Sequence, residues 1–154
     1  MTRYVDTPCT APLRASELTV GDQVLERTVR LTRADLIAYA GASGDHNPIH
    51  WSDRIASEVG LPGVLAHGML TMGQAASCVA SWAGDPARVV ALATRFSAPV
   101  VVPDPGEAVL TVAASVKAIE GDQVTLALSV TQEGASKPVL GRATAVVDLS
   151  EGRA

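Results

Sequence analysis

The segment VLAHGMLTMGQAASCVASWA, residues 64–83, decides how the rest of this chain can fold. Its twenty residues include no Asp, Glu, Lys or Arg, and twenty apolar residues are the length of a membrane span. Several Ala and Gly residues of low hydrophobicity argue against a span, and so do five polar side chains: His67, Thr71, Gln74, Ser77 and Ser81. In a soluble protein, a helix that is apolar all round is buried all round. We therefore expect residues 64–83 to form a central helix that packs against a sheet.

After residue 84 the hydrophobic period changes to two, which is typical of strands. The clearest case is residues 123–131, where Val124, Leu126, Leu128 and Val130 alternate with small or polar side chains. The pattern predicts strands at residues 23–30, 90–97, 107–119, 123–131 and 139–149. Sequential strands that are joined by short turns pair antiparallel, and a sheet with one apolar face must bury that face. The sequence thus predicts an α+β domain in which an antiparallel sheet curls around the long helix.

Two shorter helices are expected between the first strand and the long helix. Thr32 can cap the first, with Asp35 three residues later as in a capping box. Gly44 can end that helix, and Ser52 can cap the second. The side chains expected to face the core are Leu36, Ile37 and Ala40 in the first helix and Ile55, Ala56 and Val59 in the second.

Length and composition set the class of protein. The 154 residues are 47% hydrophobic and 18% charged, which predicts one globular domain over residues 17–150. Residues 1–16 lack periodicity, and we expect a poorly ordered extension there. The net charge of −4 argues against nucleic-acid binding. Cys9 and Cys78 read as reduced thiols, and no signal peptide is apparent, so we expect a cytoplasmic protein.

The stretch YAGASGDHNPIH, residues 39–50, carries the candidate chemistry. Asp45 and His50 are separated by Asn47-Pro48, which favours a turn and excludes a continuous helix. An acid and a neutral imidazole that converge on one point can hold and deprotonate a water molecule. From these residues alone, an Asp that caps a turn and a structural loop histidine are the somewhat better interpretation, since loops often contain Asp, Asn and His.

The same stretch resembles the signature of the MaoC-like, (R)-specific enoyl-thioester hydratase family. Its motif, Gly-Asp-x-Asn-Pro-hydrophobic-His, is matched in full by residues 44–50, and residues 66–73 (AHGMLTMG) resemble the family's second block. SWAGDP, residues 81–86, resembles the catalytic B subunit of actinobacterial (3R)-hydroxyacyl-ACP dehydratases. The resemblance extends over roughly residues 18–149. It implies a hotdog fold, normally dimeric.

The resemblance implies reversible hydration of a trans-2-enoyl thioester to the (3R)-hydroxyacyl thioester, with Asp45 and His50 as the catalytic pair. We expect the backbone N–H of Gly68, at a helix start, to meet the negative charge on the thioester oxygen. Gly68 can equally serve close packing. Asn47 orients the water or merely forms the turn. For His67 we expect a hydrogen-bonded structural role, and His46 is expected to be exposed or to line the mouth of the pocket.

No metal or bound cofactor is expected, because the three histidines fit no strong metal pattern and this hydration needs none. The acyl group would arrive on CoA or on the phosphopantetheine of an acyl carrier protein. Likeness to the B subunit favours the carrier protein and fatty-acid elongation. We expect a homodimer, or a heterodimer with a related hotdog subunit, and neither nucleic acid nor membrane as a partner. A subunit that is inactive without its partner and an acyl-thioesterase are the alternative functions.

Several further side chains have two readings. An acyl tunnel or the plain core would accommodate Trp51, Trp82, Met69 and Met72. Contacts to a phosphopantetheine or an acidic carrier protein would suit Arg88, Arg95 and Arg142.

Overall fold

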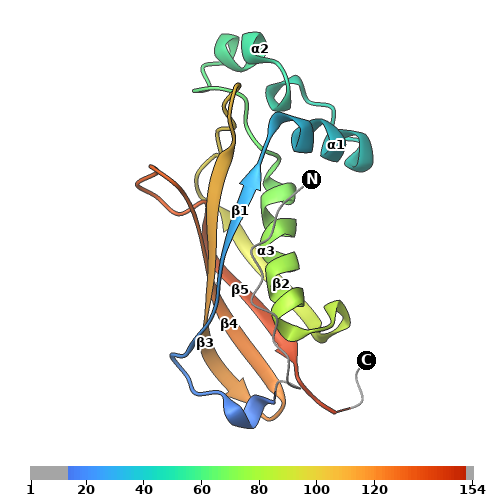
Figure 1. Ribbon diagram of the computed structural model, residues 1–154, viewed down its shortest axis with the longest axis vertical. Coiled ribbons are helices and arrows are strands. Elements are labelled where there is room, and N and C mark those ends of the chain that lie inside the picture. The colour runs from blue at the N-terminus through green and yellow to red at the C-terminus, as the bar shows by residue number, and fades with distance from the viewer. Residues whose placement is uncertain (1–13, 152–154) are drawn as a thin grey trace.

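A computed structural model describes residues 14–151, and its body is one antiparallel sheet that packs against one long helix (Figure 1). The sheet has five strands in the order β1-β3-β4-β5-β2. They are β1 (Gln23–Leu31), β2 (Val89–Phe96), β3 (Ala108–Glu120), β4 (Gln123–Gln132) and β5 (Leu140–Asp148). The helices are α1 (Arg33–Ser43), α2 (Asp53–Glu58) and α3 (Gly68–Ala83), with short 3-10 helices at Ala15–Glu17, Pro48–His50 and Pro86–Arg88.

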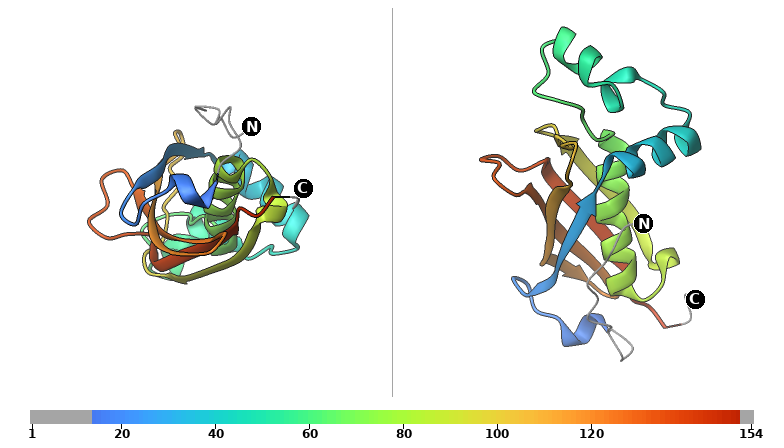
Figure 2. Two further views of the ribbon diagram at one scale, coloured as in Figure 1. Left: turned by 90° about the horizontal axis from the view of Figure 1, so that it is seen from below. Right: turned by 45° about the horizontal axis from the view of Figure 1, so that its top comes forward.

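Period-two patterning accounts for the sheet. Each observed strand end lies within one residue of its predicted position. In β4 the side chains of Val124, Leu126, Leu128 and Val130 are all buried, as their alternation predicts. The turn between β3 and β4 runs through Gly121, whose φ of 61° favours glycine. Seen end-on, the strands form an arc with α3 inside it (Figure 2), which confirms the predicted α+β architecture.

Helix α3 is shorter than predicted, because residues 64–67 are extended. Leu65 forms a β-bridge with Val101, and the Ala66 N–H donates to the Val100 carbonyl. The Pro62-Gly63 turn and this pairing occupy backbone groups that a helix would need. The prediction of a helix over residues 64–83 is therefore wrong in its first turn, and the helix begins at Gly68.

One face of α3 also contradicts the expectation of burial all round. Met69 is 57% exposed, and Gly73, Ser77 and Ser81 on the same face are exposed too. The sheet covers the opposite face, where Ala75, Cys78 and Val79 are buried. The prediction that Ile37 and Val59 face the core is also wrong, because Ile37 is 56% exposed and Val59 is 61% exposed. Both residues belong to the region of α1 and α2, which lies beyond the end of the sheet (Figure 1).

Most of the predicted extension, residues 1–16, lies outside the described residues, as does Cys9. At its end Ala15 is buried in the core. Among residues 14–151, no helix combines the length and the hydropathy that a membrane crossing requires.

Candidate active site

Helix α1 delivers the chain into the loop Gly44–His50, and both ends of α1 are built by local hydrogen bonds. At its start Thr32 and Asp35 form the predicted capping box. Partial burial raises the pKa of the Asp35 carboxyl, but hydrogen bonds from the N–H and hydroxyl of Thr32 help to hold the pKa below its ordinary value. At its end Gly44 adopts φ 78°, and its N–H donates to the Ala40 carbonyl. This glycine turns the backbone so that Asp45 leaves the helix axis.

Two Asx turns fold the loop back on itself. The Asn47 N–H donates to Asp45 Oδ1 at 3.2 Å, and the Ile49 N–H donates to Asn47 Oδ1 at 3.2 Å. The side chain of Asn47 thereby caps the 3-10 helix that ends at His50. This supports the turn-forming reading of Asn47, while its predicted contact with water or substrate stays a prediction.

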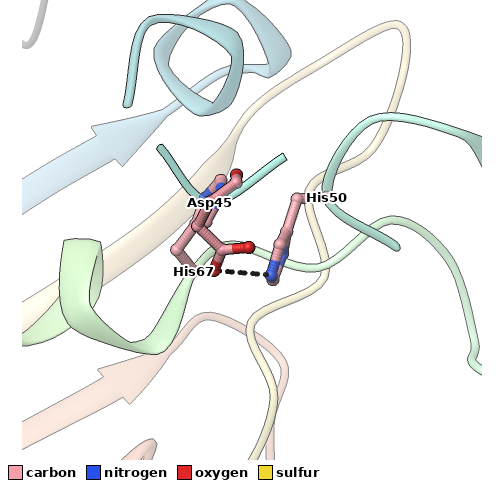
Figure 3. A group of neighbouring side chains, drawn as sticks. All are labelled: Asp45, His50 and His67. Carbon is pink, nitrogen blue, oxygen red and sulfur yellow. Dashed lines mark hydrogen bonds and ion pairs between the residues drawn. The ribbon is translucent and has the colours of Figure 1, made fainter. Parts of the chain in front are cut away.

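His50 is held in one tautomer. Its ring is buried, and Nδ1 lies 2.7 Å from the Leu65 carbonyl oxygen. A carbonyl only accepts, so Nδ1 carries the proton and the neutral ring presents a lone pair at Nε2. Nε2 lies 3.8 Å from Asp45 Oδ2 (Figure 3). A water molecule about 2.8 Å from both atoms would close a triangle with them. The two predicted catalytic side chains are thus brought together in a geometry that suits a shared water.

His67 joins this pair from the segment before α3. It is 2% exposed, its Nε2 lies 3.1 Å from the Asp45 carbonyl oxygen, and its ring stacks on that of His50 (Figure 3). Burial lowers the pKa of His67, and the nearby His50 lowers it further, against the opposing influence of Asp45. The expectation of a hydrogen-bonded histidine is confirmed. His46 on the loop is exposed, as expected, and its carbonyl accepts from the Trp51 indole N–H.

A cleft of about 400 Å³ opens beside His50. Its wall includes Gly68, at the start of α3, and its lining is mostly apolar: His50, Leu65, Ala66, Gly68, Thr71, Phe96, Ser97, Ala98, Pro99, Val100 and Val139. The first-turn amides of a helix lack helical partners, and the His67 side chain does not cap this one. Gly68 thus lies at the cleft wall, and its role as an oxyanion donor stays a prediction. A methyl group on it would lie 3.2 Å from the Phe96 ring, so its packing role holds.

Sequence reasoning did not find the other wall of the cleft. Phe96 is the last residue of β2 and residues 97–100 follow it, and nothing in their pattern marks them as site residues. The four side chains considered for an acyl tunnel (Trp51, Met69, Met72 and Trp82) do not line this cleft within the described chain. Arg88 is half-buried and donates to the Ala83 carbonyl, so it serves the end of α3. Arg95 and Arg142 are exposed near the end of the β2–β5 pair.

Asp45, His50 and His67 each offer a ligand atom, and these atoms lie within 4.8 Å of one another. A zinc ion lies about 2.0–2.1 Å from each ligating nitrogen, close to the plane of that ring. The two imidazole planes are only 23° from parallel, with centroids 3.8 Å apart, so they do not intersect within that distance. This arrangement does not fit an ion bound by both rings, and the absence of a metal stays a prediction.

Comparison with known proteins identifies the family of this chain. A family model described as "MaoC like domain" matches residues 16–134. The chain belongs to the MaoC-like domain family. A curated relative, 3-hydroxyacyl-thioester dehydratase X from Mycobacterium tuberculosis, is 40% identical over 75 residues, which is 49% of this chain and 26% of that protein. The family resemblance predicted from residues 44–50 and 66–73 is thereby confirmed.

Solved structures share the fold of this MaoC-like domain. A MaoC-like dehydratase has a TM-score of 0.85 and 38% identity, covering 89% of this chain and 42% of the other. The R-hydratase PhaJ1 from Pseudomonas aeruginosa has a TM-score of 0.76 and 24% identity, covering 96% and 88%. A more distant neighbour is the ChsH1-ChsH2 complex from M. tuberculosis, with a TM-score of 0.73 and 16% identity, covering 84% and 98%. The hotdog fold is confirmed. The chain spans 26% of the length of dehydratase X and 42% of the length of the MaoC-like dehydratase.

Proposed function

We propose that this chain catalyses the reversible hydration of trans-2-enoyl thioesters to (3R)-hydroxyacyl thioesters, with Asp45 and His50 as the catalytic pair. One observation carries the proposal: His50 turns an unprotonated Nε2 toward Asp45 Oδ2 at 3.8 Å, beside a cleft that contains a helix N-terminus. The names of the relatives, a 3-hydroxyacyl-thioester dehydratase and an R-hydratase, support the same reaction.

In the hydration direction, the water bound by Asp45 and His50 attacks C3 through its oxygen. One proton of the water passes to the pair, and the other stays on the new hydroxyl group. The electrons of the C2=C3 bond shift toward the thioester oxygen, where the first amides of α3 at Gly68 stabilise the charge. The pair then delivers its proton to C2, which restores the thioester. Dehydration follows the same steps in reverse.

The substrate reaches the site as a thioester of CoA or of an acyl carrier protein. The apolar lining of the cleft suits an acyl chain, while the exposed Arg95 and Arg142 are available for a phosphate-bearing carrier. An activity panel over chain lengths on both carriers decides between them. Release of free thiol from acyl-CoA without hydration would instead identify a thioesterase.

A second hotdog subunit, identical or related, completes the proposed enzyme. The edge strand β2 exposes Val90 and Phe96, and Met69 on α3 is more than half exposed, so apolar surface is available for a partner. A structural neighbour is named as a two-chain complex. The mass of the purified chain, measured together with its activity, distinguishes a homodimer from a subunit that needs a different partner.

The direct test uses Asp45→Asn and His50→Gln with a short enoyl-CoA. Each variant should lose activity by about 10²–10⁴-fold, the usual contribution of a general acid or base. His46→Gln is the matched control, because His46 lies on the same loop and is exposed. Full turnover by Asp45→Asn or by His50→Gln, with the activity of His46→Gln unchanged, would show that the assigned roles are wrong.

A further inference from the structure

His67 makes contacts with both members of the proposed catalytic pair but has no chemical step of its own. We propose that His67 is a positioning residue, which holds the backbone of Asp45 and the ring of His50 in fixed positions relative to the start of α3. The inference rests on the proposed function, because it assigns a role in that same reaction. It is carried by two contacts of one buried ring and by one contact of the same residue's backbone.

The first contact fixes the acid. His67 Nε2 lies 3.1 Å from the Asp45 carbonyl oxygen, so Nε2 carries the proton and donates. Asp45 itself is exposed, and its other hydrogen bonds join it only to Ser43 and Asn47, each two residues away. The bond from His67 therefore ties the loop to a segment twenty-two residues away. Without it, Asp45 would keep hydrogen bonds only to residues two positions away, Ser43 and Asn47.

The second contact fixes the base. The rings of His50 and His67 stack with centroids 3.8 Å apart and planes 23° apart. The Leu65 carbonyl holds the Nδ1 edge of His50, and the face of His67 restricts rotation about that hydrogen bond. Tyr39 packs against His67 with ring centroids 4.8 Å apart. Asp45, His50 and Tyr39 are the titratable groups that face His67, and burial favours its neutral form.

The third contact fixes the oxyanion donor. His67 is the residue before α3, and its carbonyl accepts from the Thr71 N–H at 3.2 Å in the first turn. Gly68 is its direct neighbour and lines the cleft. One residue thus joins the acid, the base and the helix start. The remaining ring nitrogen, Nδ1, is buried and has no hydrogen-bond partner among the described residues. A buried polar atom without a partner costs free energy of folding, and folding alone does not require a residue with this cost.

The test compares His67→Gln with His67→Met. The two side chains have the same length, but only Gln can present an N–H where Nε2–H donates. We expect kcat of the Met variant to fall by about a hundredfold, the scale of a misplaced catalytic group, with KM little changed. The kcat of the Gln variant should be about tenfold higher than that of the Met variant.

A purely structural role predicts the opposite order. Met buries no polar group, so the Met variant should melt at the same temperature as the Gln variant or higher. If kcat followed the melting temperature, or if the Gln and Met variants had the same kcat, the proposal would be overturned. Wild-type kcat in a folded Met variant would overturn it as well.

An activity-independent measurement separates this inference from the proposed function. Nitrogen-15 NMR of the imidazoles should show His50 as the Nδ1–H tautomer and His67 as the Nε2–H tautomer. The backbone amides of Asp45 and Asn47 should exchange with deuterated water faster in the Met variant than in the Gln variant. Equal exchange rates of these amides in the two variants would contradict the positioning role, even if the enzyme is active. A wild-type chain that shows these signals but no turnover would instead refute the proposed reaction.

Discussion

The sheet with α3 and the loop Gly44–His50 place their side chains by different means. In the sheet, each position follows from an alternation that continues along a whole strand, as in β4, and burial provides the energy. In the loop, each position depends on single hydrogen bonds, such as those from the Asn47 N–H to Asp45 and from His50 Nδ1–H to the Leu65 carbonyl. The difference teaches that stability and site geometry reside in separate parts of this molecule. Substitutions in one part should therefore leave the other largely intact.

The largest effect on stability is expected from Leu126→Ala in the centre of the sheet. Leu126 is fully buried, so truncation should cost about 2–5 kcal/mol of unfolding free energy. Activity per folded molecule should stay within about threefold of wild type, because Leu126 is not among the residues that line the cleft. Denaturant unfolding with parallel assays checks both, and Val90→Ala at the partly exposed edge is the control. A stability loss accompanied by a comparable loss of kcat in the folded protein would break the separation.

Gly68→Ala tests the place where the two regions meet. The added methyl group would lie 3.2 Å from the Phe96 ring, at the cleft wall and beside the proposed oxyanion donor. We expect kcat/KM to fall about tenfold, as overpacking displaces the ring or the helix start. Gly73→Ala on the same helix has open space around the new methyl group and should leave kcat/KM unchanged. Equal effects of the two substitutions would contradict the assignment of Gly68.

Thr32→Ala tests how far the loop depends on the helix that enters it. Loss of the capping box should cost about 1 kcal/mol at neutral pH. The folded-state pKa of Asp35 lies below 3.8, so its stabilisation is present above pH 3.8 and is lost as the pH falls through the folded value. The stability difference between wild type and variant should therefore shrink in acid. A difference that stays constant from pH 7 to pH 2 would exclude Asp35 as its source.

The smallest expected effect concerns the pH dependence of folding near His67. Its folded-state pKa lies below 6.5, so the unfolded chain binds the proton first as the pH falls. The stability that neutral His67 contributes is complete above pH 6.5 and declines as the pH falls toward the folded value. Wild-type stability should therefore decrease from pH 7 to pH 5 more steeply than that of His67→Met. Parallel curves in urea titrations would show that another group controls this range.

Sequence patterns predicted the sheet better than the helices. Alternation is local to each strand, so all five strands appeared at the expected residues. The start of α3 and the burial of Ile37 and Val59 depend on which elements lie opposite, and periodicity does not carry that information. The Asp45–His50 pair was recognised from its motif. The contacts of Phe96 and His67 with the site arise from long-range packing. Nothing in the sequence around Phe96 indicates its contact, whereas the predicted role of Gly68 placed the neighbour of His67 at the site.

The central claim is that Asp45 and His50 act as one unit on one water molecule. A double-mutant cycle of Asp45→Asn and His50→Gln, read as kcat/KM for hydration of an enoyl thioester, measures this directly. We predict that each single variant loses about 10²–10⁴-fold and that the double variant loses no more than about threefold beyond the worse single variant. Losses that multiply in the double variant would show two independent residues. Turnover retained in either single variant would show that the loop does not catalyse this reaction.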